Sequence, residues 1–324
     1  MNNKFIWVIV SGGILFLAGV VSLLSIFYVK KGGSLVYMGA ELRNTIEIPL
    51  SEADSLLADY GSKNLVVYAW QEDRVVIKEY LSSSREDAKA SVVYEGNKAV
   101  VTGGRWDWNW THLFWGGINE KIEIYLPARG IKKLELVTGS GNISAKDSFA
   151  IETEKASVQA GSGNVRWQNT KADEIVLYAN SGNVHGDGLT GDANIHTGSG
   201  NITIKDISGV VKAEAGSGNI TIEKLSGACD AKAGSGNLRI ETVEVTGDIT
   251  LHTGSGNQRL GLPEGISCSM DIHTGSGNII TDYDEFLGFD NKGKEAKGQV
   301  GDETGCRITV QTGSGNVTIK KVNI

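Results

Sequence analysis

The sequence predicts an all-β fold, a single-stranded parallel β-solenoid (β-helix) of 18–22-residue coils that is preceded by one N-terminal transmembrane helix. Three observations predict it. The four-residue word GSGN recurs through the C-terminal half of the chain. Apolar and polar residues alternate around each copy with a period of two, which indicates strands with one buried face. An uncharged run of 25 residues stands near the N-terminus.

The uncharged run at residues 5–29 predicts the transmembrane helix. As a helix it would extend ~37 Å, which is enough to cross a hydrocarbon core of ~30 Å. We therefore predict a short cytoplasmic tail at 1–4, the span at 5–29, and a juxtamembrane linker with a first strand at 30–52. One lysine and the terminal amine on one side balance two lysines on the other, so the positive-inside rule gives a tie. The layout of a short tail before a long folded part favours an extracytoplasmic C-terminal domain at the cell membrane.

The sequence of residues 53–130 predicts irregular N-terminal coils of the solenoid or a cap on its end. The segments LVVYA at 65–69, RVVIKEY at 74–80 and KIEIYLP at 121–127 have the composition of strands. SVVYEGNKAVVTG predicts a hairpin around its Gly-Asn pair.

An aromatic segment at 105–117 interrupts these strands with five closely spaced rings, which are Trp106, Trp108, Trp110, Phe114 and Trp115. One interpretation is an interaction patch for sugars or a membrane interface, because indole combines an apolar face with a hydrogen-bond donor. The other is a plug that covers the open end of the solenoid, where core and strand edges would otherwise be exposed.

Residues 131–324 predict the regular β-solenoid. Nine copies of the word, one of them with an asparagine for its first glycine, end in Asn142, Asn164, Asn183, Asn201, Asn219, Asn237, Asn257, Asn278 and Asn316. We expect these asparagines to stack as a structural amide ladder, each bonding to the coils above and below. We expect the glycines to supply positive φ angles and to let neighbouring coils approach closely. A degenerate copy, GSKN, ends in Asn64.

When the nine copies of GSGN are aligned, the residues at equivalent positions predict how the coils bury a common core. The residues five and three before the word are apolar in all nine copies, with Leu134 and Leu136 as the first pair. Stacked copies bury a continuous face that no single coil could bury alone. The longest spacing, before Asn316, contains an insertion at about 282–305, which we expect to project as a hairpin or loop near the C-terminal end.

Composition excludes several classes of function. Among 324 residues, 43 are glycine and 3 are proline, and the net charge is −7 without a basic block, which argues against a nucleic-acid partner. Three cysteines are too few for a disulfide scaffold. The word lacks the aspartate of calcium-binding nonapeptide repeats, so we predict no cofactor and no metal.

The repeats resemble those of the bacterial proteins called putative adhesins, the LiaG-like β-strand-repeat family, whose domain is formally of unknown function. The likeness rests on ELVTGSGNISA at 135–145, the reiterated TGSGN coils, WNWTHLFWGG before KIEIYLP, and GQVGDETGCRITVQTGSGNVTI at 298–319. It implies a β-helical domain, often tethered to the envelope by one N-terminal span, near cell-envelope stress systems. It implies no catalytic or binding residues.

An enzyme is disfavoured, because no pair of acids with a neighbouring base recurs on successive coils. His252 and His273 fall in the same outward column of successive coils and could lie about 5 Å apart, near enough to share a metal. Without a third ligand, we interpret them as solvated residues. Cys268 and Cys306 also share a column, and could approach each other if their coils are neighbours.

We therefore predict a non-catalytic, membrane-anchored β-solenoid that serves adhesion or cell-envelope interaction. Its partners would be the membrane, through one span, and an envelope polymer or a membrane protein. The alternative is a structural scaffold that self-associates or organises membrane partners, since the ends of a solenoid can template further pairing. A polysaccharide-acting enzyme is a weaker third interpretation.

Overall fold

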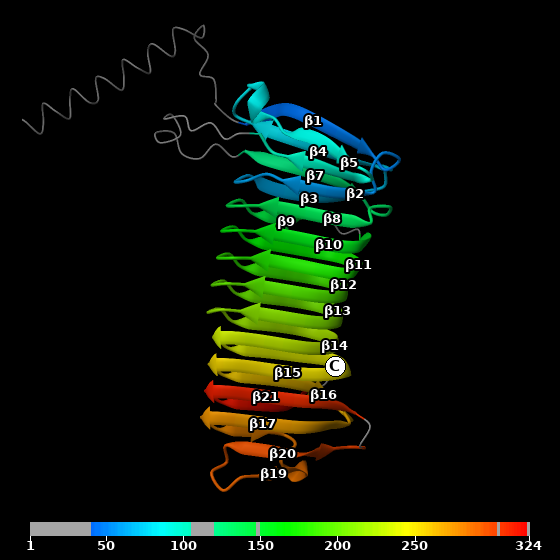
Figure 1. The fold of residues 1–324 in the computed structure, drawn as a ribbon. Coiled ribbons are helices and arrows are strands. Elements are labelled where there is room, and N and C mark those ends of the chain that lie inside the picture. Colours follow the sequence, from blue (N-terminus) through cyan, green and yellow to red (C-terminus); the bar gives the residue numbers. More distant parts are fainter. Residues whose placement is uncertain (1–39, 105–119, 147–149, 303–304, 323–324) are drawn as a thin grey trace, which may run out of the picture. The chain divides into compact units, whose positions relative to one another are not determined.

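The computed structural model describes residues 40–104, 120–146, 150–302 and 305–322. In these ranges it contains 22 strands of one hydrogen-bonded sheet and two short 3-10 helices. Figure 1 shows the strands stacked one above another in a column.

The elements follow the predicted strand segments closely. The N-terminal elements are β1 (Glu41–Pro49), β2 (Ser55–Asp59), β3 (Asn64–Trp70), β4 (Arg74–Leu81), η1 (Glu86–Ala88), β5 (Ser91–Glu95), β6 (Lys98–Thr102) and β7 (Lys121–Pro127). The central strands are β8 (Lys133–Thr138), β9 (Ile143–Ala145), β10 (Ile151–Ala160), β11 (Val165–Ala179), β12 (Val184–Thr197), β13 (Ile202–Ala215), β14 (Ile220–Ser235) and β15 (Leu238–Ser255). The C-terminal elements are β16 (Gln258–Pro263), β17 (Cys268–Ser276), β18 (Ile279–Thr281), η3 (Asp284–Phe286), β19 (Leu287–Phe289), β20 (Glu295–Val300), β21 (Cys306–Ser314) and β22 (Val317–Val322).

Equivalent strands of neighbouring coils pair in parallel and in register. Leu136, Val158, Leu177 and Ile195 lie opposite one another on β8, β10, β11 and β12. All four side chains are fully buried. The predicted all-β solenoid with its alternating buried positions is therefore confirmed.

Each coil has two long faces that meet at the GSGN corner. The first face carries the strand residues before the corner, as in β8, and the second face carries those after it, as in β9. Their inward side chains fill the space between the faces, and on both faces these side chains are almost fully buried in consecutive coils. The outward side chains form columns that run along the stack.

The last coil of the chain lies inside the stack rather than at its end. β21 pairs on one side with β15 and on the other with β17, and β22 lies in the same way between β16 and β18. The coils therefore do not stack in chain order. The cause is β20, which pairs antiparallel with the outer edge of β17, so that the following coil can pair only with its inner edge.

The N-terminal end repeats this arrangement. β2 lies between β6 and β8, and β3 lies between β7 and β9. Beyond them β4 pairs antiparallel with β7, and β1 pairs antiparallel with β4. The predicted hairpin is present as β5 and β6. Antiparallel strands thus cover the edges of β6 and β7 at the N-terminal end of the stack and the edge of β17 at the other end (Figure 1).

The insertion at 282–305 does not project from the stack as expected. Its strands β19 and β20 form an antiparallel pair, and β20 is hydrogen-bonded along β17 from Val300 to Glu295. It covers a strand edge that would otherwise be open, and this satisfies backbone groups that a projecting loop would leave exposed.

Among the residues described, no helix is long and apolar enough to cross a membrane. The tail predicted at 1–4, the span predicted at 5–29 and residues 30–39 of the linker predicted at 30–52 lie outside these residues, whereas the rest of that linker segment contains β1.

The position of the last coil can be tested by cross-linking. Thr250 lies opposite Thr309, and Thr309 lies opposite Asp271, so Thr250 and Asp271 are separated by one coil. We expect the pair Thr250→Cys and Thr309→Cys to form a disulfide under mild oxidation, because adjacent strands lie about 5 Å apart. The pair Thr250→Cys and Asp271→Cys serves as the control and should remain reduced at about twice that distance. Peptide mapping that finds the second cross-link instead of the first would contradict the intercalated order.

Candidate functional site

The corner asparagines form one continuous hydrogen-bonded column. From Asn142 onward, the backbone N–H of each asparagine donates to the side-chain oxygen of the preceding one at 2.8–2.9 Å. In the first six of these links the side-chain amide also donates to that oxygen, at 3.1–3.3 Å. In spatial order the column runs Asn64, Asn142, Asn164, Asn183, Asn201, Asn219, Asn237, Asn257, Asn316 and Asn278.

Threonines before the word add a second link between coils. The hydroxyl of Thr197 accepts from the N–H of Gly200 at 3.0 Å and donates to the carbonyl of Gly182 in the preceding coil at 2.8 Å. Thr253, Thr274 and Thr312 donate to the preceding corner in the same way. Because these side chains are buried, their hydroxyls stabilise the stack from inside the corner.

The corner glycines are required mainly by close packing and seldom by positive φ. Of the glycines in the ten words, only Gly61, Gly256 and Gly315 have positive φ, so our expectation about φ was largely wrong. A Cβ on Gly218 would instead overlap the carbonyl oxygen of Gly200 in the preceding coil. Left-handed backbone occurs at a different bend, where Asn169, Gly188, Asp206 and Lys224 have φ of 49–62°.

The two strands that flank the aromatic segment in the sequence both end beside a corner. β6 ends at Thr102 opposite Asp59, and β7 begins at Lys121 opposite Asn64, so these described strand ends lie next to the GSKN corner of the neighbouring coil. The predicted patch of Trp106, Trp108, Trp110, Phe114 and Trp115 lies outside the described residues. Its flanking residues are described, and they lie against a polar network that sequence reasoning did not find.

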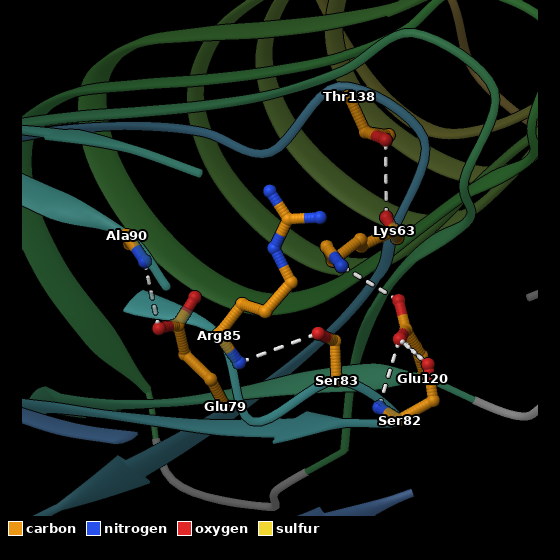
Figure 2. A network of polar contacts seen from close by, with 8 residues as sticks. All are labelled: Lys63, Glu79, Ser82, Ser83, Arg85, Ala90, Glu120 and Thr138. Atoms are coloured by element: carbon orange, nitrogen blue, oxygen red, sulfur yellow. Dashed lines mark hydrogen bonds and ion pairs between the residues drawn. The ribbon is translucent and has the colours of Figure 1, made fainter. Parts of the chain in front are cut away.

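This corner network, shown in Figure 2, contains a nearly buried ion pair. Lys63 Nζ lies 2.6 Å from Glu120 Oε2, and the side chains are 8% and 14% exposed. Glu120 Oε1 accepts from the N–H and the hydroxyl of Ser82 at 2.9 and 2.5 Å. Burial alone would raise the pKa of Glu120, but the bonds from Lys63 and Ser82 outweigh it and lower that pKa.

A second carboxylate of the network, Glu79, is completely buried. Its Oε2 accepts from the N–H of Ala90 at 2.9 Å and from the amide of Asn44 at 2.6 Å. Burial, together with the charge of Glu79, raises the pKa of Tyr60 well above 10.0. Tyr60 in turn contacts Gly103, where a Cβ would crowd its ring. The network therefore fixes both attachment points of the aromatic segment.

The outer side of β3, β4 and β7 carries what we call the aromatic–cation cluster. Its rings are stacked or tilted against each other, with centroids of Tyr68 and Tyr125 5.1 Å apart and those of Trp70 and Tyr125 5.5 Å apart. Its cations lie over ring faces at 4.6–5.6 Å. The members are Tyr68, Trp70, Arg74, Lys78, Tyr80, Lys121, Glu123 and Tyr125.

Glu123 is the charged centre of this cluster. It accepts from Lys121 Nζ at 2.7 Å and from the hydroxyl of Tyr125 at 3.1 Å. Burial and this carboxylate raise the pKa of Tyr125 to about 12, so its hydroxyl stays a donor. The sequence places these residues on three separate segments, and the alternation of outward residues in YAW, KEY and KIEIY was the available signal.

The family was settled by sequence comparison. A family model described as Toastrack DUF4097 matches residues 55–320. The chain belongs to this family. The resemblance inferred from the repeats is thus confirmed, and it concerns a domain of unknown function. None of the curated proteins matches the chain.

Solved structures similar to this Toastrack chain include three with related descriptions. A "putative adhesin" from Bacteroides fragilis is 14% identical, with 86% of this chain and 96% of that one covered and a TM-score of 0.40. A "putative adhesin" from Parabacteroides merdae is 11% identical, with 88% and 98% covered and a TM-score of 0.38. A "putative cell adhesion protein" from Clostridium sporogenes is 12% identical, with 86% and 98% covered and a TM-score of 0.26. With TM-scores this low, these likenesses carry no argument about function.

The two histidines singled out on the first face of the Toastrack stack are not neighbours. His252 and His273 both lie opposite Gln311, which separates them, because the last coil is intercalated. Within the described part of the chain, no group of three metal-ligating residues occurs. The expectation of about 5 Å between them is therefore wrong.

The two cysteines do come together. Cys268 and Cys306 lie opposite one another on β17 and β21, and both are free thiols. Burial raises the pKa of Cys268 to about 12, and burial also raises that of Cys306. Both thiols are therefore protonated at neutral pH, which makes them poor nucleophiles.

The ladder can be tested at Asn219, whose side chain links three Toastrack coils. Asn219→Ala removes the acceptor for the N–H of Asn237 and should lower the free energy of unfolding by about 1–2 kcal/mol. Thermal melting measures the change. Asn194→Ala is the matched control, because Asn194 is exposed on the first face and makes no side-chain hydrogen bond to a described residue. Equal melting temperatures for Asn219→Ala and the control would count against the ladder.

The corner network predicts a pH-dependent contribution to stability. The pKa of Glu120 is lowered in the folded chain, so its stabilisation is present above the ordinary value of 4.5 and is lost as pH falls through the folded value. Glu120→Gln should cost about 2–3 kcal/mol at neutral pH, because Lys63 loses its counter-charge, and should lose less further stability on acidification. Melting temperatures measured from neutral to acidic pH test this. Glu154→Gln, at an exposed carboxylate without a described ion pair, is the control, and an identical profile for both variants would refute the role of Glu120.

Proposed function

We propose that this Toastrack chain is a non-catalytic, membrane-anchored, extracytoplasmic β-solenoid that serves adhesion or cell-envelope interaction. The observation that carries the proposal is the aromatic–cation cluster on an otherwise regular, rigid surface. Aromatic rings and cations held in fixed positions on a flat sheet lose little conformational entropy when they bind a partner. A ladder of identical coils supplies a rigid support for them.

The titratable groups support a binding role over a catalytic one. Acid–base catalysis needs a carboxyl group whose pKa is tuned upward beside an opening for substrate. Every carboxylate with a resolved shift in the described residues has its pKa lowered, and these are Asp54, Glu120, Glu123, Asp282 and Asp290. Such carboxylates stabilise a fold, since they stay ionised as acceptors for structural hydrogen bonds.

The proposal includes the short cytoplasmic tail, the membrane span at 5–29, the external position of the solenoid and a link to envelope stress. The uncharged run and the family resemblance support these parts. The span would hold the N-terminal end of the domain near the membrane, because only eleven residues separate it from β1.

A scaffold that self-associates is the second candidate, and one observation favours it. Near the C-terminal end of the stack, Ile280, Phe286 and Phe289 are 43–50% exposed. In the described residues β19 pairs only with β20, so one of its edges is open. Apolar side chains beside an open edge can pair with a second copy. A monomer in analytical ultracentrifugation at high concentration would exclude this candidate.

Protease treatment of intact bacteria tests the outward position. We expect the solenoid to be lost from intact cells that carry the full chain, because it would lie outside the membrane, and we expect a cytoplasmic marker to survive. The same digestion of lysed cells shows that the folded domain can be cleaved under these conditions. A domain that is cleaved after lysis but intact on whole cells would overturn the extracytoplasmic assignment.

A further inference from the structure

We propose that the second face of the solenoid binds an acidic polysaccharide that lies along the stack. This inference deepens the proposed envelope function and rests on it. It identifies the face and the class of polymer, neither of which follows from the family.

The first support is a column of basic side chains, which we call the basic column. It is the outward column nearest the corner on the second face. In spatial order it contains Lys78, Glu123, Val66, Ser144, Arg166, His185, Thr203, Thr221, Arg239, Arg259, Thr318 and Ile280. Its only acid is Glu123, which Lys121 already neutralises. The chain as a whole carries −7, so this concentration of positive charge is local.

The cations of the basic column are short of counter-charges. Arg239 has an ion pair, with Glu241 at 2.7 Å. No ion pair joins Lys78, Arg166 or Arg259 to a carboxylate of the described residues. Arg259 also lies directly opposite Arg239, and like charges in register repel each other. An anionic group bound between them would remove that repulsion.

The potential around Arg166 is positive at the neighbouring coil as well. His185 lies opposite Arg166, and its pKa is lowered by burial and by the charges of Arg166 and Lys205, against the opposing effect of Asp187. A neutral imidazole beside a cation can donate a hydrogen bond to an anion without adding repulsion. Lys78, Arg166 and Arg239 are four strand spacings apart in turn, about 19 Å each. This spacing suits a long linear polyanion better than a small ion.

The aromatic–cation cluster supplies the contacts that a sugar polymer needs beyond charge. Tyr68, Tyr125 and Trp70 expose part of their rings beside the start of the basic column. The apolar C–H faces of pyranose rings pack against such side chains, while the tyrosine hydroxyls and Lys78 can bond sugar hydroxyls and carboxylates. Rings and cations together therefore favour an acidic sugar over a simple polyphosphate.

A membrane surface fits the same face less well. Interfacial membrane binding needs large apolar side chains that insert between lipids. Among residues 40–104, 120–146, 150–302 and 305–322, the exposed large apolar residues are Leu42, Val93, Tyr94, Val210, Ile280, Phe286 and Phe289. Only Ile280 belongs to the basic column, at its far end. The second outward column carries mixed charge, with Asp187, Glu223 and Glu241 beside Lys205, so an anionic lipid surface that covered the whole face would meet acids as well as bases.

Direct binding of the full-length chain in neutral detergent tests the proposal. The probes are alginate as an acidic polysaccharide, dextran as a neutral one, inorganic polyphosphate, and vesicles of phosphatidylglycerol. We expect salt-sensitive binding to alginate and none to dextran. The triple change Lys78→Gln, Arg166→Gln and Arg259→Gln should weaken alginate binding roughly tenfold. The matched control removes three lysines of the first face, Lys133→Gln, Lys212→Gln and Lys232→Gln, and should bind as the parent does.

A second variant separates sugar recognition from charge. Tyr68→Ser with Tyr125→Ser should weaken binding to alginate but leave binding to polyphosphate unchanged, once melting has shown that the variant is folded. Three outcomes would overturn the proposal. They are an equal loss of alginate binding in the triple variant of the basic column and in the control triple variant, binding of the chain to dextran, and stronger binding to vesicles than to alginate. Isolated envelopes are tested in parallel. If the chain binds isolated envelopes but not alginate, this inference alone is overturned. If it binds neither envelopes nor alginate, the proposed function is overturned as well.

Discussion

In-register parallel stacking is the constraint on which the rest of this structure depends. Because each coil pairs with its neighbours at a spacing of about 4.8 Å, every residue contacts the equivalent residue of the next coil. The stack is therefore most stable where each side chain can pack or hydrogen-bond with an identical side chain at the equivalent position of the next coil. Asparagine meets this condition, since its amide donates on one side and accepts on the other. Glycine meets it at the corner because a Cβ would overlap the carbonyl of the preceding coil.

The same constraint makes the two ends a physical problem, since a parallel stack leaves open edges wherever it stops. At both ends strands of opposite direction cover an outer edge, with β4 and β1 on the edge of β7 at one end and β20 on the edge of β17 at the other. In both places one coil is intercalated out of chain order. At the C-terminal end the antiparallel strand takes the outer edge of β17, and the last coil then pairs with the inner edge. The pairing of β20 with the outer edge of β17 and the position of the last coil on its inner edge are thus two consequences of the same arrangement.

The sequence was sufficient for features that repeat and insufficient for those that occur once. The apolar columns and the asparagine column could be predicted because nine copies report the same environment. The 38-residue spacing before Asn316 showed an insertion but not the intercalation, and the error over His252 and His273 followed from it. The ion pair of Lys63 and Glu120 joins residues 57 positions apart with no repeat to align them. The aromatic–cation cluster was likewise hidden, because antiparallel pairing of β4 with β7 brings its parts together.

Departures from the repeat also indicate where function can reside. A column that served only the stacking of coils would contain side chains that can lie opposite an identical side chain without repulsion. Thr203 and Thr221 are such a pair. Arginine opposite arginine does not meet that condition, yet Arg239 and Arg259 are neighbours. The rings and cations of the aromatic–cation cluster stand on the same face where the repeat gives way to antiparallel strands. A rigid lattice has little need for such side chains in its own stability, and a linear partner with complementary charge would account for both groups at once.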